Sequence, residues 1–215
     1  MKNILLIGLG RFGRHAAMTF YERGQQVMAI DKDEERVNDV LPYVTNAQIG
    51  DATDEDFLRS LGVRNFDACL VTIGDDFQSS LETTSLLKEM GAPWVISRAS
   101  RDIQAKFLLR NGADEVIYPE KEMAERTAVR CGADHILDYF ELEDGYAIFE
   151  TTVPEKWIGR NLIELNLRQK CGVTVLAKRT GGRFSAAFSP TAPFEGGETV
   201  LLIGTDEDVY RCFGR

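Results

Sequence analysis

Hydrophobic and polar positions follow a regular rhythm over the first 120 residues. Six short apolar runs have the length of β-strands, at residues 3–9, 26–31, 47–51, 67–73, 93–99 and 114–119. Between them lie stretches whose apolar residues recur every three or four positions, which is the spacing of a helix face. The clearest of these stretches are 11–24, 54–62 and 75–91. Strands that alternate with such helices predict βαβ units and a parallel sheet with helices on both faces.

The rhythm changes after residue 120. A helical stretch at about 120–131 leads into an acidic, turn-prone segment, and shorter elements follow. The later pattern predicts a strand at 147–153, a helix at 161–171, a hairpin that turns at Gly181 and Gly182, and a last strand before residue 204. We therefore predict an α/β protein with a Rossmann-like parallel sheet and a second, small α+β domain. The expected limits are 1–118 for the nucleotide-binding domain, 119–140 for a crossover helix and hinge, and 141–215 for the small domain.

Composition and charge narrow the classes of function. The chain has 215 residues, of which 44% are hydrophobic and 27% charged, as is ordinary for a folded globular protein. Its formal net charge of −9 would repel phosphate backbones, so no nucleic-acid partner is expected. No apolar run approaches the roughly 20 residues that span a bilayer, and no secretory signal precedes the first strand run. We therefore expect a cytoplasmic protein.

The first strand run leads directly into a glycine-rich turn. In "GLGRFG" the glycines are Gly8, Gly10 and Gly13, and a helical stretch begins there. Such glycines permit a tight turn, close approach of the backbone to a phosphate, and close contact of helix and strand. Amide N–H groups at the helix N-terminus then face the anion. This arrangement predicts a dinucleotide or adenine-nucleotide site.

An acidic residue ends the second strand run. Asp31 stands 18 residues beyond Gly13, where a carboxylate accepts hydrogen bonds from the hydroxyls of an adenosine ribose. A carboxylate there would repel a 2′-phosphate, which disfavours NADP. Asp31 could instead cap the next helix, and the two roles are compatible.

Two further loops follow strand runs at the edge of the sheet where ligands of open α/β sheets collect. In "GDATDEDF", Asp51 could accept from an adenine amino group, and Asp54 is typical of a helix N-cap. In "TIGDDFQSS", Gly74 would let the backbone run close to a ligand. Asp75 and Asp76 could line the site or cap the following helix.

Residues for chemistry on a bound nucleotide are missing from the pattern. A dehydrogenase needs an acid or base beside its substrate, and the chain offers neither a Tyr-x-x-x-Lys pair nor a histidine in a suitable setting. The phosphate loop GxxxxGK[ST] of nucleotidases is also lacking. We therefore predict a protein that senses a nucleotide and is not an enzyme. The alternatives are a small NAD(H)-binding oxidoreductase or redox sensor, and a structural oligomeric module with a vestigial site.

Several stretches of the first domain carry a family resemblance when they are taken together. They are "IGLGRFG", "AIDKDEERV", "GDATDEDFLRSLGV", "LVTIGDDFQSSLETTSLLKEMG", "VISRAS" and "GADEVIYPEKEMAERTA". With them the chain resembles the RCK proteins, the cytoplasmic regulators of potassium channels and transporters, and among these the Ktr and Trk regulatory subunits. The second domain resembles the TrkA C-terminal module. Its matching stretches are "IGRNLIELNLRQKCGVTVLAKR" and "GGETVLLIGTDEDV".

The resemblance implies a Rossmann-like domain that forms homodimers, assembles into an octameric ring and docks on a membrane-embedded potassium channel or transporter subunit. It implies ATP or ADP as the ligand, with NAD(H) also possible. By position, the residues implied to bind the nucleotide are Gly8, Gly10, Arg11, Phe12, Gly13, Asp31, Lys32, Asp51, Ala52, Ile73, Gly74, Arg98 and Glu120.

Three of these residues receive particular roles from the resemblance. Arg98 is implied to lie near the phosphates, and Arg11 to reach a phosphate held by the dimer partner. Glu120 is implied to hold a divalent cation, Mg²⁺ or Ca²⁺, at the dimer interface beside the phosphates. Read without the resemblance, Glu120 is an acid in the first turn of a helix, which the helix dipole favours.

Some members of the family bind cyclic di-AMP in the C-terminal module. Ile158, Arg168, Val173 and Val175 match the general pattern of that site. Thr174 stands where the cyclic-di-AMP-binding branch is expected to have an asparagine. In the alternative interpretation, the three apolar residues belong to the core of a strand–helix unit.

Overall fold

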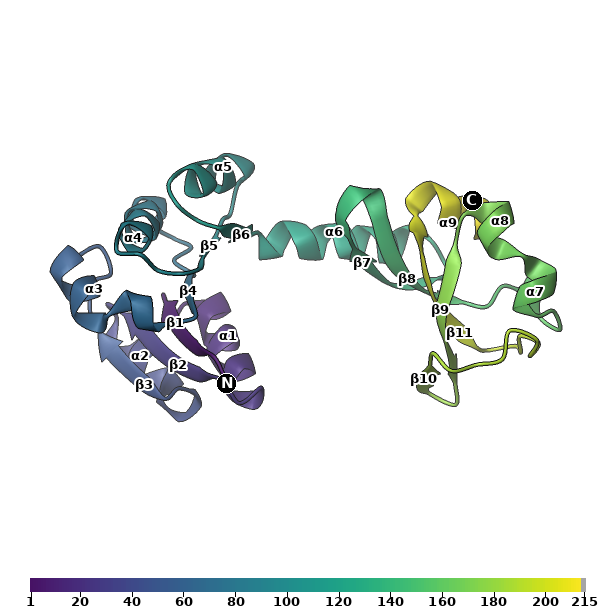
Figure 1. Ribbon diagram of the computed structural model, residues 1–215, viewed down its shortest axis with the longest axis horizontal. Helices are drawn as coiled ribbons and strands as arrows, with labels where there is room; N and C mark the ends of the chain where they lie inside the picture. The colour runs from purple at the N-terminus through teal and green to yellow at the C-terminus, as the bar shows by residue number, and fades with distance from the viewer. Residues whose placement is uncertain (214–215) are drawn as a thin grey trace. The chain divides into compact units, whose positions relative to one another are not determined.

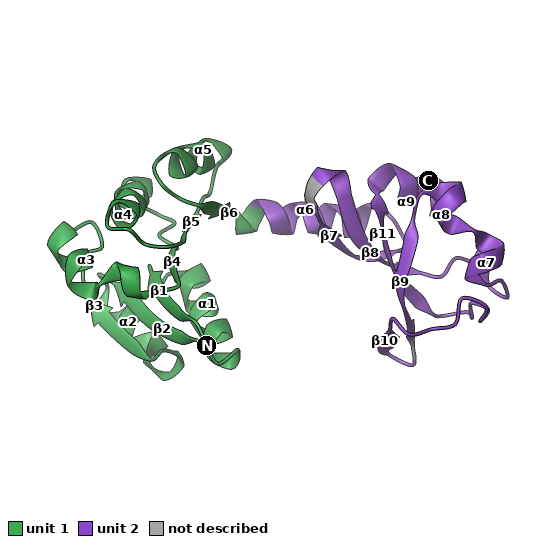
Figure 2. Ribbon diagram, in the orientation of Figure 1, with its two compact units in different colours: residues 1–120 green, residues 121–215 purple. Residues whose placement is uncertain are grey.

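A computed structural model of the chain describes residues 1–213, apart from the side chains of Glu143 and Thr180. The chain divides into two compact units, Met1–Glu120 and Lys121–Arg215, which Figure 2 shows in green and purple. Each unit has its own sheet and its own hydrophobic core, so each is described by itself.

The first unit is built on a six-stranded parallel sheet with the strand order β3-β2-β1-β4-β5-β6. Its strands are β1 (Asn3–Ile7), β2 (Gln26–Asp31), β3 (Asn46–Ile49), β4 (Ala68–Val71), β5 (Val95–Arg98) and β6 (Glu115–Ile117). This order places β1 and β4 side by side, although they are far apart in the chain. The predicted Rossmann-like parallel sheet is therefore confirmed.

Helices cover both faces of this sheet (Figure 1). They are α1 (Arg11–Glu22), α2 (Glu34–Val40), α3 (Glu55–Leu61), α4 (Phe77–Glu89) and α5 (Asp102–Arg110). Because side chains alternate along a strand, successive residues of β1 enter different cores. Leu6 is buried with Ala17 of α1, whereas Leu5 is buried with Leu58 of α3 and Leu87 of α4. The continuous apolar runs of the sequence follow from this two-sided burial.

Aspartates begin three of these helices, as side chains that accept from free amides do. Asp33 caps α2 and Asp54 caps α3, each accepting hydrogen bonds from two backbone N–H groups of the first turn, and Asp76 caps α4 by accepting one from the amide of Ser79. The cap roles predicted for Asp54 and Asp76 are confirmed. The N-cap of α2 is Asp33 and not Asp31, so the side chain of Asp31 does not have the alternative capping role.

The second unit contains a five-stranded sheet with the order β10-β9-β11-β8-β7, in which every neighbouring pair is antiparallel. Its strands are β7 (Ile136–Glu141), β8 (Tyr146–Thr152), β9 (Thr174–Thr180), β10 (Arg183–Ser185) and β11 (Thr199–Thr205). The hairpin from β9 to β10 turns at Gly181 and Gly182, which have φ of 60° and 81°. This confirms the predicted turn, because two successive positive φ values suit a two-residue hairpin.

Helices of the second unit pack on one face of its sheet. They are α7 (Leu162–Leu165), α8 (Leu167–Cys171) and α9 (Asp206–Phe213), and α6 (Pro119–Gly132) leads into this unit from the first. Trp157 and Phe149 are the largest fully buried side chains of the core. In β8 and β11 buried residues alternate with half-buried ones, the pattern of a sheet with one covered face.

The second unit departs from the predicted elements in three places. The predicted crossover helix and hinge end at residue 140, but residues 136–140 belong to strand β7 (Ile136–Glu141) of the sheet. The single helix predicted at 161–171 is two helices, because Asn166 adopts a left-handed conformation with φ of 47° and separates α7 from α8. Helix α9 was not predicted, although its acidic first turn is a helix-start signal. The domain limits themselves remain a prediction.

Within residues 1–213, no helix combines the length and the apolar character needed to cross a bilayer.

Candidate nucleotide-binding site

A cavity of about 880 Å³ opens at the carboxyl edge of the parallel sheet, within the first unit. It lies where the strand order reverses, because β1 continues to β2 on one side while β4 stands on the other. Ligands of open α/β sheets bind at this switch point. The volume is within the range of pockets for small molecules and cofactors.

The glycine-rich turn forms the floor of the cavity, and two of its glycines are required by close contacts. Gly8 has a φ of 90°, and a Cβ added there would lie 2.9 Å from the backbone nitrogen of Ile73. A Cβ on Gly13 would lie 2.0 Å from the carbonyl oxygen of Gly8. A Cβ on Gly10 would meet no atom within 4 Å. Gly10 therefore borders open space in the cavity, whereas Gly8 and Gly13 pack closely against neighbouring backbone and have no room for a side chain.

Helix α1 points its N-terminus into this space. Gly10 is its N-cap and supplies no side-chain hydrogen bond, and the first turn carries no acidic residue. The amide N–H groups of a first turn have no partner within the helix, and the helix dipole makes them attractive to anions. The start of α1 is consequently suited to hold a phosphate group.

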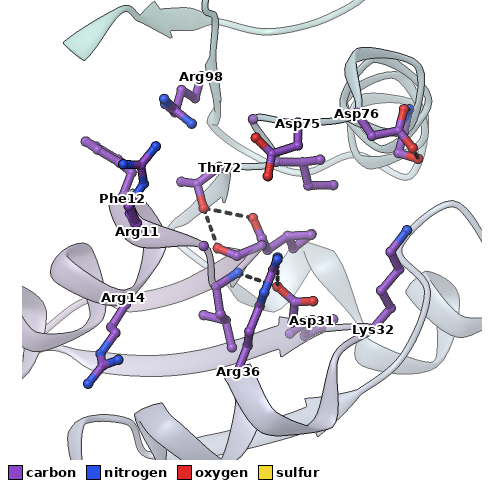
Figure 3. Close-up of a pocket in the computed structure, with 18 of the residues that line it drawn as sticks. Arg11, Phe12, Arg14, Asp31, Lys32, Arg36, Thr72, Asp75, Asp76 and Arg98 are labelled. Carbon is purple, nitrogen blue, oxygen red and sulfur yellow. Dashed lines mark hydrogen bonds and ion pairs between the residues drawn. The ribbon is translucent and has the colours of Figure 1, made fainter. Parts of the chain in front are cut away.

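Asp31, at the end of β2, is the most buried carboxylate of the cavity, with 7% of the residue exposed. Its Oδ2 accepts a hydrogen bond of 2.6 Å from the amide of Leu9, and its Oδ1 accepts one of 3.0 Å from the amide of Asp33. The guanidinium of Arg36 lies 3.8 Å from Oδ2. Figure 3 shows the carboxylate of Asp31 beside the guanidinium of Arg36. These contacts fix its orientation and leave lone pairs for a further donor.

Thr72 ties the end of β4 to the glycine turn. Its hydroxyl donates to the carbonyl oxygens of Ile7 and Gly8, and the side chain is buried (Figure 3). Sequence reasoning missed this residue. The signal that could have identified it is a small hydroxyl side chain directly after a buried strand and two residues before Gly74.

Arg98 and Glu120 both line the cavity and form an ion pair with each other. The guanidinium of Arg98 passes directly over Gly74, where a Cβ would lie 2.1 Å from its Nη1. It also lies over the ring of Phe12, with 6.0 Å from Cζ to the ring centroid. Glu120 stands in the first turn of α6. The placement of both residues at the cavity agrees with the site that the resemblance implied.

Asp51 and Asp76, two further acids that line the cavity, accept local hydrogen bonds. The amide and hydroxyl of Thr53 donate to Asp51 and lower the pKa of its carboxyl below the ordinary value. The hydroxyl and amide of Ser79 do the same for the pKa of Asp76. The charge of Lys32 lowers both pKa values further. This part of the rim therefore carries ionised carboxylates, which repel anions.

Twelve of the thirteen residues implied for the site line the same cavity. The exception is Gly13, which lies in the packing between α1 and the turn. Residues that line the cavity but were not among the predicted binding residues include Arg14, His15, Arg36, Thr72, Ser79 and Ser100. Most of these follow a strand end by several residues, so only the fold brings them to the cavity. Their roles, and those of the predicted residues, are not decided by placement alone.

The predicted cation site has one protein ligand in this chain. Within the part of the chain that the structure describes, no group of three or more His, Cys, Asp or Glu side chains could hold a metal ion. The carboxylate of Glu120 is paired with Arg98. A divalent cation here would need phosphate oxygens or a second copy of the chain to complete its ligands.

Of the residues implied to bind cyclic di-AMP, some are exposed at the surface and others are buried in the core of the second unit. Ile158 is 45% exposed, whereas Val173 is completely buried and Val175 packs against the same core. Arg168 and Thr174 are exposed at the surface. The core interpretation therefore holds for the two valines.

Comparison with known proteins shows the family to which the chain belongs. The TrkA-N domain family matches residues 4–119. The chain is 36% identical over 210 residues to Ktr system potassium uptake proteins C and A of Bacillus subtilis, in each case over 98% of this chain and 95% of the relative. It is 31% identical to Ktr system potassium uptake protein A of Vibrio alginolyticus, over 96% of this chain and 94% of the relative.

Among solved structures, the GsuK channel has the same fold, with a TM-score of 0.72 at 15% identity over 100% of this chain. A second structure, described as the GsuK channel bound to NAD, gives a TM-score of 0.70 at 15% identity over 98% of this chain. The chain spans 40% and 38% of those channel chains, respectively. At this identity the likeness concerns the fold.

Proposed function

Since the chain belongs to the TrkA-N domain family, we propose that it is a regulatory subunit of a membrane-embedded potassium channel or transporter, switched by adenine nucleotide. Similarity to Ktr potassium uptake proteins along almost the whole of both chains supports the assignment to potassium transport. The protein acts by binding a nucleotide and changing the state of its partner. Catalysis on the nucleotide is not part of the proposal.

The observation that carries the ligand assignment is the pairing of two features across one cavity. The uncapped N-terminus of α1 offers amide donors to phosphates, and the buried, oriented carboxylate of Asp31 offers acceptors to ribose hydroxyls. The open space beside Gly10 lets phosphates approach the backbone. A nucleotide is the ligand that needs an anion site and a hydroxyl acceptor together.

Switching requires a ligand that binds two states with different affinity. ATP and ADP share the site and differ in one charged phosphate, and Arg11 is the residue proposed to read that difference. Arg11 opens α1 at the mouth of the cavity, is exposed, and has no ion-pair partner among the described residues. In a homodimer it would reach the phosphate held by the other copy, so that the extra phosphate of ATP favours one arrangement of the subunits.

The proposal includes a divalent cation, Mg²⁺ or Ca²⁺, beside the phosphates. Glu120 lines the cavity on the side of Arg98, where a carboxylate would repel phosphate unless a cation lay between them. One carboxylate with phosphate oxygens is a common way for proteins to hold Mg²⁺. Two copies of Glu120 near a dimer axis would complete the site.

The assembly proposed is a homodimer that forms an octameric ring at the cytoplasmic face of the membrane, attached through its channel or transporter partner. Nucleic acid is not a proposed partner, in keeping with the net charge of −9. Cyclic di-AMP remains a proposed second ligand of the C-terminal unit. Exposed Ile158 and Arg168 are the residues of the implied set available to contact it.

A ligand panel tests the proposal directly. Titration calorimetry of the full chain with ATP, ADP, NADH and NADPH should show binding of ATP and ADP, and weak or no binding of NADPH because Asp31 repels a 2′-phosphate. Co-reconstitution with a Ktr-type membrane subunit in vesicles should then show potassium flux that depends on which nucleotide is bound. Absence of binding by every nucleotide would favour the structural module with a vestigial site.

NAD(H) is the second candidate ligand, because the cavity of about 880 Å³ is large enough for a dinucleotide. An oxidoreductase would oxidise NADH in the presence of carbonyl substrates, and we expect no such turnover. A redox sensor would bind NADH and NAD⁺ with different affinities and ignore the third phosphate of ATP. The same calorimetric panel, extended by NAD⁺, distinguishes these outcomes.

A further inference from the structure

Arg98 is held in one place by its surroundings. It ends β5, with only 16% of its side chain exposed, and its guanidinium lies in the space that the absent side chain of Gly74 leaves open. The ring of Phe12, in the first turn of α1, lies beneath it. The guanidinium is therefore fixed near the start of α1, the part of the cavity suited to phosphate.

The anion that Arg98 contacts in this chain is its own Glu120. A carboxylate oxygen of Glu120 accepts from Nη2 of Arg98, while the buried Nε of Arg98 has no partner in the described part of the chain. Glu120 is the more exposed member of the pair, with 59% of its side chain accessible. The guanidinium of Arg98 is therefore fixed and retains an unpaired N–H group. The carboxylate of Glu120 is exposed enough for water to solvate it if the ion pair breaks.

We propose that Glu120 is a specificity-determining residue of the nucleotide site, because its carboxylate occupies the phosphate-binding position of Arg98 and a nucleotide must displace it. The inference rests on the proposed nucleotide-binding function. It concerns binding without a divalent cation, when no ion can bridge Glu120 and phosphate.

Because a ligand must displace Glu120 from Arg98, the site distinguishes ligands that carry phosphate from ligands that do not. Adenosine has no phosphate with which to reach Arg98, so it leaves the pair intact. ADP brings phosphate oxygens that form stronger, bidentate contacts with a guanidinium than a single carboxylate oxygen does. ADP therefore displaces Glu120 at a cost, and removing the carboxylate removes that cost.

The test is titration calorimetry of the full chain in EDTA, with adenosine and ADP as ligands. Glu120→Gln should bind ADP about two- to fivefold more tightly than wild type, the size expected for losing a partly exposed competing ion pair. Its affinity for adenosine should be unchanged. Glu115→Gln is the matched control, because it removes the same charge from an exposed residue at the start of β6 that does not line the cavity, and it should bind both ligands like wild type.

A second variant checks that the effect passes through Arg98. In an Arg98→Gln background, which should itself bind ADP less tightly, adding Glu120→Gln should tighten ADP binding much less than it does in the wild-type background, because only the direct repulsion between the carboxylate and phosphate is then removed. Circular dichroism would establish that each variant is folded.

The outcomes separate this inference from the function on which it rests. If wild type binds ADP but Glu120→Gln binds it equally or less tightly in EDTA, the inference is wrong and the proposed function stands. If Glu120→Gln also tightens adenosine binding, the effect does not arise from competition for Arg98, and the inference is again wrong. If wild type binds neither ligand, the proposed function and the inference both fail.

Discussion

At the scale of the residue, the three glycines of one turn have different physical duties. The backbone conformation of Gly10 is open to any residue, with φ of −63°, and its missing side chain leaves ligand space. Gly13 borders no ligand space, but a side chain there would collide with the carbonyl of Gly8. The sequence motif does not distinguish Gly10 from Gly13. Because one borders the cavity and the other packs against backbone, substituting each in turn can separate an effect on ligand binding from an effect on folding.

We predict opposite consequences for Gly10→Ala and Gly13→Ala. Gly13→Ala forces the backbone apart and should destabilise the first unit by about 1–3 kcal/mol or more, as overpacking does. Gly10→Ala should change stability by less than about 1 kcal/mol, the size of a weaker N-cap, while greatly reducing nucleotide affinity. Chemical denaturation and calorimetry measure the two effects. Nucleotide binding by Gly10→Ala at wild-type affinity would show that phosphates do not approach this part of the turn.

Asp31 is the residue whose substitution tests the ribose end of the site. We predict that Asp31→Asn weakens binding of ATP and ADP by at least about tenfold, which corresponds to about 1.4 kcal/mol, because hydrogen bonds to a charged acceptor are lost. Asp33→Asn is the control, since it removes a nearby charge from a helix cap outside the cavity lining. Because Asp31 also holds the amide of Leu9, unfolding must be followed in parallel. Equal affinities of Asp31→Asn and Asp33→Asn would remove Asp31 from the site.

At the scale of the element, helix α9 is held to the second unit by contacts at its C-terminal end. The ammonium of Lys156 donates to the carbonyl oxygen of Cys212, at 2.7 Å. The ring of Phe213 stacks on His135, with 4.6 Å between centroids and 3° between planes, and also contacts Trp157. Burial lowers the pKa of His135 below its ordinary 6.5, with a smaller opposing effect of Asp134 and a smaller reinforcing effect of Lys156.

This burial predicts a pH dependence of stability. In the unfolded chain His135 binds a proton as the pH falls through about 6.5, whereas the folded chain resists protonation until lower pH. The stabilisation from neutral His135 is therefore present above that pH and is lost as the pH falls toward the folded pKa. We predict that wild type loses stability on acidification faster than His135→Phe.

Fluorescence of Trp157 in a Trp94→Phe background reports the unfolding of the second unit, because Trp157 is buried in its core. His15→Gln, in the first unit, serves as the control and should follow wild type. A pH profile of His135→Phe parallel to that of wild type would show that this histidine does not contribute.

At the scale of the whole molecule, the site of a single chain is incomplete for the proposed switch. Arg11 has no ion-pair partner in the described residues, and Glu120, which is paired with Arg98, is a single carboxylate and would need further ligands to hold a cation. A second copy would supply the missing groups to both. The assembly is accordingly part of the proposed mechanism, because the difference between ATP and ADP would be read across an interface.

We predict a homo-oligomer, at least a dimer and in the full assembly an octamer. Multi-angle light scattering of the pure chain, with and without nucleotide, measures this directly. A monomer at tens of micromolar under both conditions would contradict the prediction and would leave Arg11 without the phosphate it is proposed to reach.

The same interface predicts which arginine distinguishes the nucleotides. Arg11→Ala should weaken binding of ATP by about tenfold and binding of ADP much less, because a permanently charged guanidinium loses contact with the third phosphate only. Arg23→Ala, at the exposed far end of α1, is the control for removing one positive charge. Equal losses for ATP and ADP would mean that Arg11 does not read the third phosphate.

The sequence by itself determined the features that depend on neighbours in the chain. Alternation of strand and helix patterns predicted the parallel sheet, because periodicity records which faces are buried. Asp54 and Asp76 were identifiable as caps, since an N-cap bonds to amides two or three residues away. The turn at Gly181 and Gly182 was predicted for the same reason: two residues with positive φ define it locally.

Only the tertiary structure decided contacts between segments that are distant in the chain. Thr72 meets the carbonyl of Gly8 across 64 residues, and Arg98 meets Glu120 across 22. Strand β7 exists because β8 provides its hydrogen-bond partners, which a turn-prone, acidic sequence does not reveal. Pairing and competition among charges depend on distance in space, and local periodicity contains no information about it. The sequence therefore predicted that a nucleotide would bind beside Gly10, whereas the fold decided that Glu120 already faces the arginine which would receive its phosphates.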